Sequence, residues 1–377
     1  VHLKASTAAE ARQTWQAALA LRDDRGHEST LLSLTLLNNL ARVAQHDNDI
    51  DSQVGLHRQL VARSAQVLGE HHPWHLTYTA TLAWTLARAG RPGEARRLLQ
   101  RAEPALARDE SGQVRGWVML VHGDLARGRV DHEDRDLVAA RQSYQAVLDD
   151  RSASASDLYG ARMGLGFVAA QEGREAEMHA LLGQVVAETP YENGAIILAE
   201  ALIDLGRPNE AVDELGAVLA RCAALDPAAP EAQGCHWSRY QLGRAYQQLG
   251  EHAAAERVLA QQAAIWEPVL APHDLGLLAV RRTLGEAVLD QGRFDEAAAI
   301  LRAVEATYAA AVEPDYVPLA HTRLALARAL TGEREAMPAD AAALAEQGLA
   351  ALRAHGATFA DELQAQENRV AGRSTGD

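Results

Sequence analysis

Residues that end one helix and begin another recur at near-regular intervals along this chain. Such positions include Gly90-Arg91-Pro92-Gly93, Gly173, Gly206-Arg207-Pro208-Asn209, Gly250-Glu251-His252 and Gly292-Arg293-Phe294-Asp295. Glycine ends helices readily, and proline, aspartate and asparagine are common where helices begin. The intervals are 33 residues from Gly173 to Gly206, 44 from Gly206 to Gly250 and 42 from Gly250 to Gly292. A helical hairpin repeated at this spacing is typical of an α-solenoid.

The segments between these positions carry the hydrophobic period of a helix. Leu242, Ala245, Tyr246 and Leu249, for example, are spaced by three or four residues, and strand-like alternation is rare. Alanine makes up about a fifth of the chain, and alanine, leucine, arginine and glutamate all favour helices. We therefore expect helices of roughly 12 to 16 residues, joined in pairs by turns of about four residues.

Composition excludes several classes of function. The net charge of −15 argues against a general binder of nucleic acids or anionic membranes. No run of 18 apolar residues exists, so no membrane-spanning helix is expected, and the N-terminus does not have the form of an intact signal peptide. Arginine and alanine are abundant whereas Lys4 is the only lysine, which indicates the coding bias of a GC-rich bacterium.

The best repeats have the pattern Leu-Gly-x-Ala-apolar, followed by Gly-x-apolar-x-x-Ala. This pattern occurs at 242–256 and 284–297, and it resembles the tetratricopeptide repeat. Two further motifs, Leu37-Asn38-Asn39-Leu40-Ala41 and Leu68-Gly69-Glu70-His71-His72-Pro73, resemble the 42-residue subtype known from kinesin light chains. The resemblance implies an all-α fold, a solenoid of about eight hairpins forming a right-handed superhelix. It leaves function open, because the same fold serves many roles, including parts of bacterial regulators, kinases and scaffolds.

We expect residues 1–377 to form a single superhelical domain. Within it, 5–22 would be the second helix of a truncated repeat, 30–356 about eight hairpins and 357–370 a capping helix. The first helices of the hairpins are predicted near 30–45, 74–89, 113–127, 157–172, 194–205, 236–249, 276–290 and 318–331. Inserts at 131–136 and 331–338 lengthen the turns of the third and eighth hairpins. The repeats begin in the middle of a hairpin, so we expect the chain to be the repeat region of a larger protein.

No motif in the sequence predicts catalysis, a cofactor or a metal site. The cluster His71-His72-Pro73-Trp74-His75 could suggest zinc, but no cysteine or carboxylate accompanies it, and His-Pro belongs to the repeat pattern. Residues 47–51 imitate the start of a calcium loop. Ser52 stands where such a loop needs glycine, and Arg58 where it needs glutamate. Phosphate-binding loops and hydrolase, protease and kinase motifs are absent from the sequence.

Cys222 and Cys235 are the only two cysteines, and they flank the loop between the fifth and sixth hairpins. The ends of two helices across such a loop can approach the Cα separation of about 6 Å that a disulfide needs. A disulfide would favour an oxidising compartment such as the periplasm, whereas two buried free thiols would be compatible with the cytoplasm. Both alternatives stay open at this point, and the compartment is therefore unknown from the sequence.

Binding is expected on the concave face, which the first helix of each hairpin lines in such superhelices. Counting from the Leu-Gly or Leu-Ala landmark of each repeat predicts concave residues in four hairpins. They are Asn38, Asn39 and Arg42; Thr77, Trp84 and Arg88; Trp237, Tyr240, Arg244 and Gln247; and Arg282, Glu286 and Asp290. Asparagine can pair with a peptide backbone, arginine suits carboxylates, and aromatic residues often anchor interfaces. For each residue taken singly, packing between hairpins is an equally good explanation.

The leading hypothesis is therefore a protein-interaction module that binds a peptide segment or partner protein, as the sensory or scaffolding part of a bacterial regulator. One alternative is self-association into a homo-oligomer. Another is an accessory region that captures substrate for a linked catalytic domain such as a Ser/Thr kinase. In each case the expected partner is a protein or peptide, with no nucleic acid and no direct membrane insertion.

Overall fold

A computed structural model of the chain describes residues 5–24, 30–47, 49–106, 114–128, 136–189, 191–222, 232–334, 337–355 and 364. Within these ranges it contains seventeen helices and no strand. The helices are α1 (Ala5–Asp23), α2 (Leu31–His46), α3 (Ile50–Leu68), α4 (Pro73–Arg88), α5 (Pro92–Leu106), α6 (Arg115–Arg127), α7 (Leu137–Asp149), α8 (Ala155–Gln171), α9 (Glu175–Ala187), α10 (Tyr191–Asp204), α11 (Pro208–Cys222), α12 (Ala232–Gln248), α13 (His252–Trp266), α14 (Leu275–Leu289), α15 (Phe294–Ala311), α16 (Val317–Thr331) and α17 (Ala339–Ala354). None of the described helices is both long and apolar enough to span a membrane.

The helices confirm the prediction of an all-α solenoid built from about eight hairpins. From α2 onward they pair in chain order, α2 with α3 through to α16 with α17, and α1 packs against α2. The first helices lie close to their predicted ranges. The largest difference is at α12, which begins at Ala232 where the sequence predicts a start at 236. The predicted capping helix at 357–370 falls outside the described residues, as do parts of both inserts, except that residue 364 is helical.

The hairpin turns have the backbone conformation that the glycine pattern predicts. Gly250 and Gly292, which follow α12 and α14, have φ angles of 73° and 77°. Most side chains clash with the backbone in this left-handed region, so glycine is the residue that ends these helices at least cost. The next helix then begins within a few residues, which folds the chain back into a hairpin.

Small residues allow the two helices of a hairpin to cross closely. A Cβ atom added to Gly243 would lie 2.5 Å from Cγ of Leu259, and one added to Gly285 would lie 2.8 Å from Leu301. Any side chain at these positions would force the helices apart. Hairpin α4–α5 has Ala83, fully buried, at the equivalent position. The abundance of glycine and alanine therefore has a packing role beyond coding bias.

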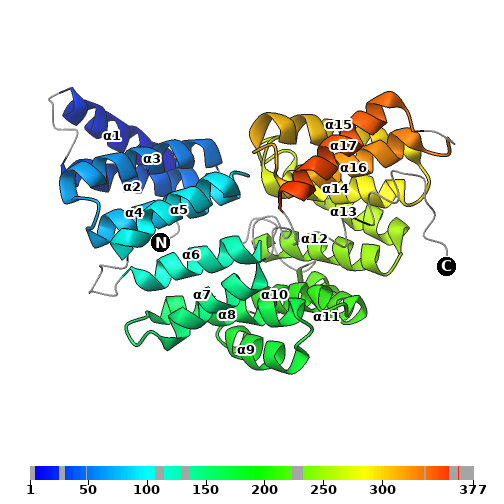
Figure 1. Cartoon of the computed structure of the whole chain (residues 1–377), viewed down its shortest axis with the longest axis horizontal. Coiled ribbons are helices and arrows are strands. Elements are labelled where there is room, and N and C mark those ends of the chain that lie inside the picture. Colours follow the sequence, from blue (N-terminus) through cyan, green and yellow to red (C-terminus); the bar gives the residue numbers. More distant parts are fainter. Residues whose placement is uncertain are drawn as a thin grey trace.

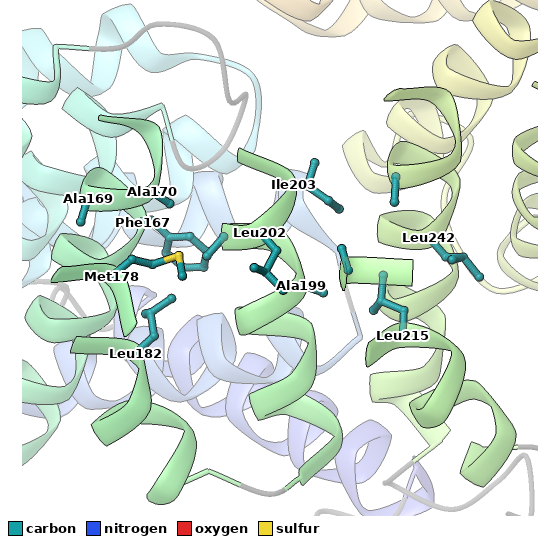
Figure 2. Close-up of a cluster of buried hydrophobic side chains, with 13 residues drawn as sticks. Phe167, Ala169, Ala170, Met178, Leu182, Ala199, Leu202, Ile203, Leu215 and Leu242 are labelled. Carbon is teal, nitrogen blue, oxygen red and sulfur yellow. The ribbon is translucent and has the colours of Figure 1, made fainter. Parts of the chain in front are cut away.

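The hydrophobic core runs along the array instead of forming one central cluster. Figure 2 shows one part of it, in which Phe167, Met178, Leu182, Leu215 and Leu242 connect side chains from α8 through to α12. A second cluster joins α3, α4, α5 and α6 in the same way. Each hairpin thus buries apolar surface against its neighbours, as expected for a solenoid.

The array curls until its second hairpin meets the loop that leads into its last hairpin (Figure 1). In Figure 1 the helices from α1 to α5 lie opposite those from α14 to α17, with α6 to α12 completing the circuit between them. The segment that follows α15 contacts the start of α5: the amide of Gly93 donates a hydrogen bond of 2.7 Å to the carboxylate of Glu313. The hairpins therefore form a nearly closed ring.

Candidate functional site

The candidate site is the inner side of this ring. In Figure 1 the first helices α6 and α12 border the middle of the ring, whereas the second helices α9 and α11 lie on its outer side. The predicted concave residues belong to α2, α4, α12 and α14, except that Asp290 directly follows the end of α14. The structure places them in two very different surroundings, which we describe in turn.

Three predicted residues of α2 are not used by the fold. The side chains of Asn38 and Asn39 are half-buried and that of Arg42 is exposed. No hydrogen bond, ion pair or ring contact connects any of these three side chains to another of the described residues. Two amides and a guanidinium therefore present free donors and acceptors on the side of α2 that the repeat pattern predicts to face inward.

The predicted residues of α4 extend this surface with aromatic groups. Trp84 is partly buried, and the guanidinium carbon of Arg88 lies 4.7 Å from the centre of its ring. The ring centre of Trp117, from α6, lies 6.4 Å from that of Trp84. The hydroxyl of Thr77 instead donates a hydrogen bond of 3.0 Å to the carbonyl of Pro73 in its own helix.

We call this surface the N-terminal inner face. It comprises Asn38, Asn39 and Arg42 of α2, Trp84 and Arg88 of α4, and Trp117 of α6. It combines free hydrogen-bonding groups, two cations and two indole rings that are not fully buried. These are the chemical groups that commonly recognise peptide backbones, carboxylates and apolar side chains.

The predicted residues of α12 have a different role, because they bond to neighbouring helices. Arg244 lies 3.5 Å from the carboxylate of Asp204 in α10, and it donates a hydrogen bond of 2.8 Å to Gln241. The carboxylate of Asp204 also accepts a 2.9 Å hydrogen bond from Gln171 of α8. Gln247 donates a 3.1 Å hydrogen bond to the backbone carbonyl of Thr283 in α14. The chain of contacts thus ties four successive first helices together.

The same pattern continues through α14. Arg282 and Glu286 form an ion pair of 3.1 Å within the helix, and Asp290 lies 3.0 Å from Arg328 of α16. We call this set of bonded side chains, from Gln171 to Arg328, the C-terminal polar ladder. Its partners Asp204, Gln241 and Gln171 were not predicted from the sequence. Asp204 could have been found, because it follows its landmark Ala199 by the same interval as Asp290 follows Gly285.

Electrostatics support the structural role of the ladder. Burial alone would lower the pKa of Arg244, but the nearby Tyr240, Asp204 and Glu200 outweigh it and hold the pKa above its ordinary value. The side chain of Asp204 is only 3% exposed. A carboxylate so buried needs a cation or several hydrogen bonds, and Arg244 and Gln171 supply both.

The two predicted aromatic residues of α12 differ in their surroundings. Tyr240 is only 6% exposed and packs with Trp266 and Leu277, so it belongs to the core and not to the inner surface. The packing explanation therefore holds for Tyr240. Trp237 is 46% exposed, and its ring meets that of Trp266 edge-on with 5.1 Å between centres.

The motifs that could suggest metal binding have structural roles. The imidazole of His72 accepts a hydrogen bond of 3.1 Å from the amide of Trp74 and so caps α4. His75 is buried, and its Nδ1 lies 2.8 Å from the hydroxyl of Ser64. Asp49 caps α3 by accepting a 3.0 Å hydrogen bond from the amide of Ser52. Among the described residues, no group of three potential ligands is arranged around a possible metal position.

Cys222 and Cys235 form a disulfide in the structure, with their Cα atoms 6.0 Å apart. The bond connects the end of α11 to the first turn of α12, and it is buried against Ala195 and Val218. It therefore braces the junction between the fifth and sixth hairpins, next to the part of α12 that carries Trp237.

Comparison with known families accounts for this architecture. A tetratricopeptide repeat model matches residues 32–108 and 234–310, and a second model of the same repeat matches residues 194–217. The chain is a tetratricopeptide repeat protein. This fold is a protein-interaction module, and its repeats are generally non-catalytic. No curated protein matches the chain significantly.

Several solved structures contain similar repeats. The nearly identical TPR-like repeats of a kinesin light chain from Podosopora anserina are 28% identical, with 52% of this chain and 96% of that chain covered and a TM-score of 0.41. A Rap protein complexed with Competence and Sporulation Factor is 15% identical, with 90% and 99% covered and a TM-score of 0.53. The TPR domain of P58(IPK) is 14% identical, with 92% and 100% covered and a TM-score of 0.23. At 15% identity, the likeness to the Rap protein concerns the fold alone.

Proposed function

We propose that this tetratricopeptide repeat protein binds an extended segment of a partner protein on its N-terminal inner face. One observation carries the proposal. Asn38, Asn39 and Arg42 have no partner among the residues that the structure describes, whereas most of the predicted polar residues on α12 and α14 bond to other side chains or to the backbone. Polar groups that the fold does not use are available to a ligand.

The chemistry of this face suggests what the segment contains. An asparagine amide can donate to a backbone carbonyl and accept from a backbone N–H, so Asn38 and Asn39 suit an extended main chain of any sequence. Arg42 and Arg88 favour a carboxylate, either a side chain or a C-terminus. Trp84 and Trp117 offer partly exposed rings on which an apolar side chain can pack. The proposed ligand is therefore an extended, acidic peptide with at least one apolar residue.

The test begins with a random linear peptide library displayed on phage and selected on the purified protein. Selected peptides are then measured by calorimetry against Asn39→Ala, Arg42→Ala and the control Arg302→Ala. Arg302 is an exposed arginine of α15 without a recorded partner, which matches it to Arg42. We expect each inner-face change to weaken binding about tenfold, or about 1.4 kcal/mol, and the control to have no effect. Unchanged affinity in both inner-face variants, with an unchanged circular dichroism spectrum, would exclude this surface.

At the level of the cell, we propose that the chain is the sensory or scaffolding region of a bacterial regulator. Binding in the ring would then alter the shape of the array and signal to an attached domain. A linked catalytic domain, such as a Ser/Thr kinase, would make the chain its substrate-capturing part. The complete reading frame of the gene decides between these roles: a catalytic domain in the same frame supports the second, and a regulatory domain supports the first.

Exposed apolar residues near α1 favour self-association as a second candidate. Leu21, Leu31 and Leu32 are 51%, 64% and 50% exposed, and all three lie at the end of the array where α1 connects to α2. Leucines gathered at one surface often mark an interface. Sedimentation over a hundredfold range of concentration is the test, with Leu31→Glu as the variant. A concentration-dependent dimer that the variant abolishes supports this function, and a monomer throughout excludes it.

The disulfide suggests where the protein works. Stable disulfides form in oxidising compartments, and therefore we propose the periplasm or the exterior of a bacterial cell. Intact mass measured after alkylation, with and without reductant, tests this proposal on protein taken from its native host. Alkylation of both cysteines without reductant would instead place the chain in the cytoplasm.

A further inference from the structure

Hydrogen bonds close the ring by joining the start of α5 to the segment between α15 and α16, which is far away in the sequence. The carboxylate of Glu313, between α15 and α16, accepts a 2.7 Å hydrogen bond from the amide of Gly93 and a 3.1 Å bond from that of Glu94. In return, the amide of Glu313 donates a 3.0 Å bond to the carbonyl of Gly90. These three backbone amides, together with the guanidinium of Arg97, which lies 3.4 Å from the same carboxylate, connect hairpin α4–α5 to the loop that leads into the last hairpin.

This contact supplies something that the sequence around α5 lacks. The first amides of a helix have no partner within the helix, and a side-chain oxygen just before it usually accepts from them. In α3 that acceptor is local, because Asp49 bonds to the amide of Ser52. Before α5 the corresponding residue is Arg91, whose side chain has no acceptor. Glu313 takes over the capping role from a position 220 residues away from Gly93.

Two further contacts join the N-terminal hairpins to the C-terminal ones. The side chain of Val312 packs so closely on Gly90 that a Cβ atom at Gly90 would lie 2.3 Å from Cγ1 of Val312. The imidazole of His273, between α13 and α14, lies 3.2 Å from the carboxylate of Asp51 at the start of α3. Both partners of this second pair are well exposed, so it adds little energy. The closed ring is thus stabilised mainly by the contacts of Glu313 and Val312.

The packing of the hairpins indicates where the ring can bend. At the other junctions between described hairpins, the second helix of one hairpin packs most extensively on the first helix of the next. At the junction of the second and third hairpins, α6 packs more on α4 than on α5. The packing between the second helix of one hairpin and the first helix of the next is therefore reduced between α5 and α6.

We propose that Glu313 is a latch. It holds the ring closed, and its release lets α1 to α5 turn away from α14 to α17 about the junction between α5 and α6. Because α2 and α4 carry the N-terminal inner face, opening the latch would change access to that face. The effect on binding rests on the proposed function, whereas the latch itself does not.

Distances between spin labels measure the latch directly. Labels at Gln100→Cys in α5 and Ala310→Cys in α15 lie on exposed positions of the two joined segments, and the native cysteines are occupied by their disulfide. We expect one narrow, short distance in the otherwise unchanged protein. Glu313→Ala should add a longer distance and raise the ratio of open to closed rings about fivefold, the effect of losing one helix cap. The same distance distribution in Glu313→Ala, with the helices intact by circular dichroism, would overturn the proposal.

A matched pair of glycines separates the latch from a general loss of stability. Gly90 and Gly250 have φ angles of 71° and 73°, so alanine strains the backbone equally at both. Only at Gly90 does the added Cβ meet Val312, because nothing lies within 4 Å of the position at Gly250. We expect Gly90→Ala to produce the longer distance between the two spin labels, and Gly250→Ala to show only the short one. Equal effects of the two changes would show that strain, and not the latch, opens the ring.

These results are independent of the peptide experiment. If Arg42→Ala loses peptide binding, the distances between the spin labels should still be those of the unchanged protein. If Glu313→Ala leaves the label distances unchanged, so that the latch proposal fails, the effect of Arg42→Ala on peptide affinity should remain. If both proposals hold, Glu313→Ala changes the affinity of a selected peptide by about the same factor as it changes the fraction of open rings.

Discussion

The inner sides of the two halves of the ring use similar residues for different purposes. In the C-terminal polar ladder, Arg244 and Asp290 pair with residues of neighbouring helices, 3.5 Å from Asp204 and 3.0 Å from Arg328. On the N-terminal inner face, Arg42 occupies the same repeat position as Arg244 and has no partner in the described part of the chain. The same position in the repeat therefore holds a paired arginine in one hairpin and a free one in another, and the neighbouring hairpin decides which.

The difference teaches how such an array divides scaffold from site. A polar ladder makes the relative orientation of successive hairpins more specific, because each buried charge requires its partner. A face without such partners contributes little to stability and leaves its hydrogen-bonding groups to a ligand. The following predictions test this division, beginning with the largest expected effect.

Removing the central arginine of each half should have very different consequences for stability. Arg244→Ala removes the cation that lies 3.5 Å from the carboxylate of Asp204, whose side chain is only 3% exposed. We expect a loss of about 3 kcal/mol in the free energy of unfolding. Arg42→Ala should cost less than about 0.5 kcal/mol, because the side chain is exposed and unpaired. Urea unfolding followed by circular dichroism measures both, and equal losses would mean that the two faces do not differ.

Acid should destabilise the N-terminal half first. Burial lowers the pKa of His57 in α3 to about 4 from its ordinary value of 6.5, and its Nδ1 lies 2.9 Å from the hydroxyl of Thr85. The unfolded chain therefore takes up a proton near pH 6.5, whereas the folded chain resists until about pH 4. Stability is full above pH 6.5 and falls with the pH, by about 2 kcal/mol at pH 5. The pKa values of His75 and His122, in α4 and α6, are lowered by burial as well.

The C-terminal half should remain stable at pH 5, although burial also lowers the pKa of His236 in α12. Hydrogen bonds from Arg293 and Gln291 hold the pKa of Glu256 below its ordinary value of 4.5, so its contribution is lost only in stronger acid. Hydrogen exchange followed by mass spectrometry at pH 7 and pH 5 compares the halves, after correction for intrinsic rates. We expect α3 and α4 to lose protection before α13 to α15, and His57→Gln to remove most of the difference. Simultaneous loss in both halves would contradict this assignment.

The smallest expected effect concerns the close crossing of the two helices in hairpin α12–α13. Gly243 in α12 stands where α4 has Ala83, and a Cβ at Gly243 would lie 2.5 Å from Leu259. We expect Gly243→Ala to cost about 1.5 kcal/mol, because Leu259 must move. Gly216→Ala in α11 is the control. Its Cβ meets nothing within 4 Å, so it should stabilise by about 0.5 kcal/mol through helix propensity. A neutral Gly243→Ala in thermal unfolding would show that this crossing is not tightly packed.

The sequence predicts what depends on local pattern. The glycine intervals and the repeat motifs lead to the hairpins and to the first helices, within a few residues. The same counting predicts which residues of α2 face inward. The burial of Tyr240 does not, because Trp266 and Leu277, which cover it, come from the following helices. The bond between Glu313 and Gly93 is still further from prediction, since no motif connects segments 220 residues apart.

The most direct test of the division between scaffold and site is to locate a bound peptide. A peptide selected from the random library is made with a photoreactive benzophenone residue in place of its apolar residue, irradiated on the protein and mapped by mass spectrometry. The account predicts cross-links to α2, α4 and α6, close to Asn39, Trp84 and Trp117. Cross-links confined to α12 and α14 would contradict it, because the polar ladder would then be the binding surface and the free groups of α2 would have no role in binding.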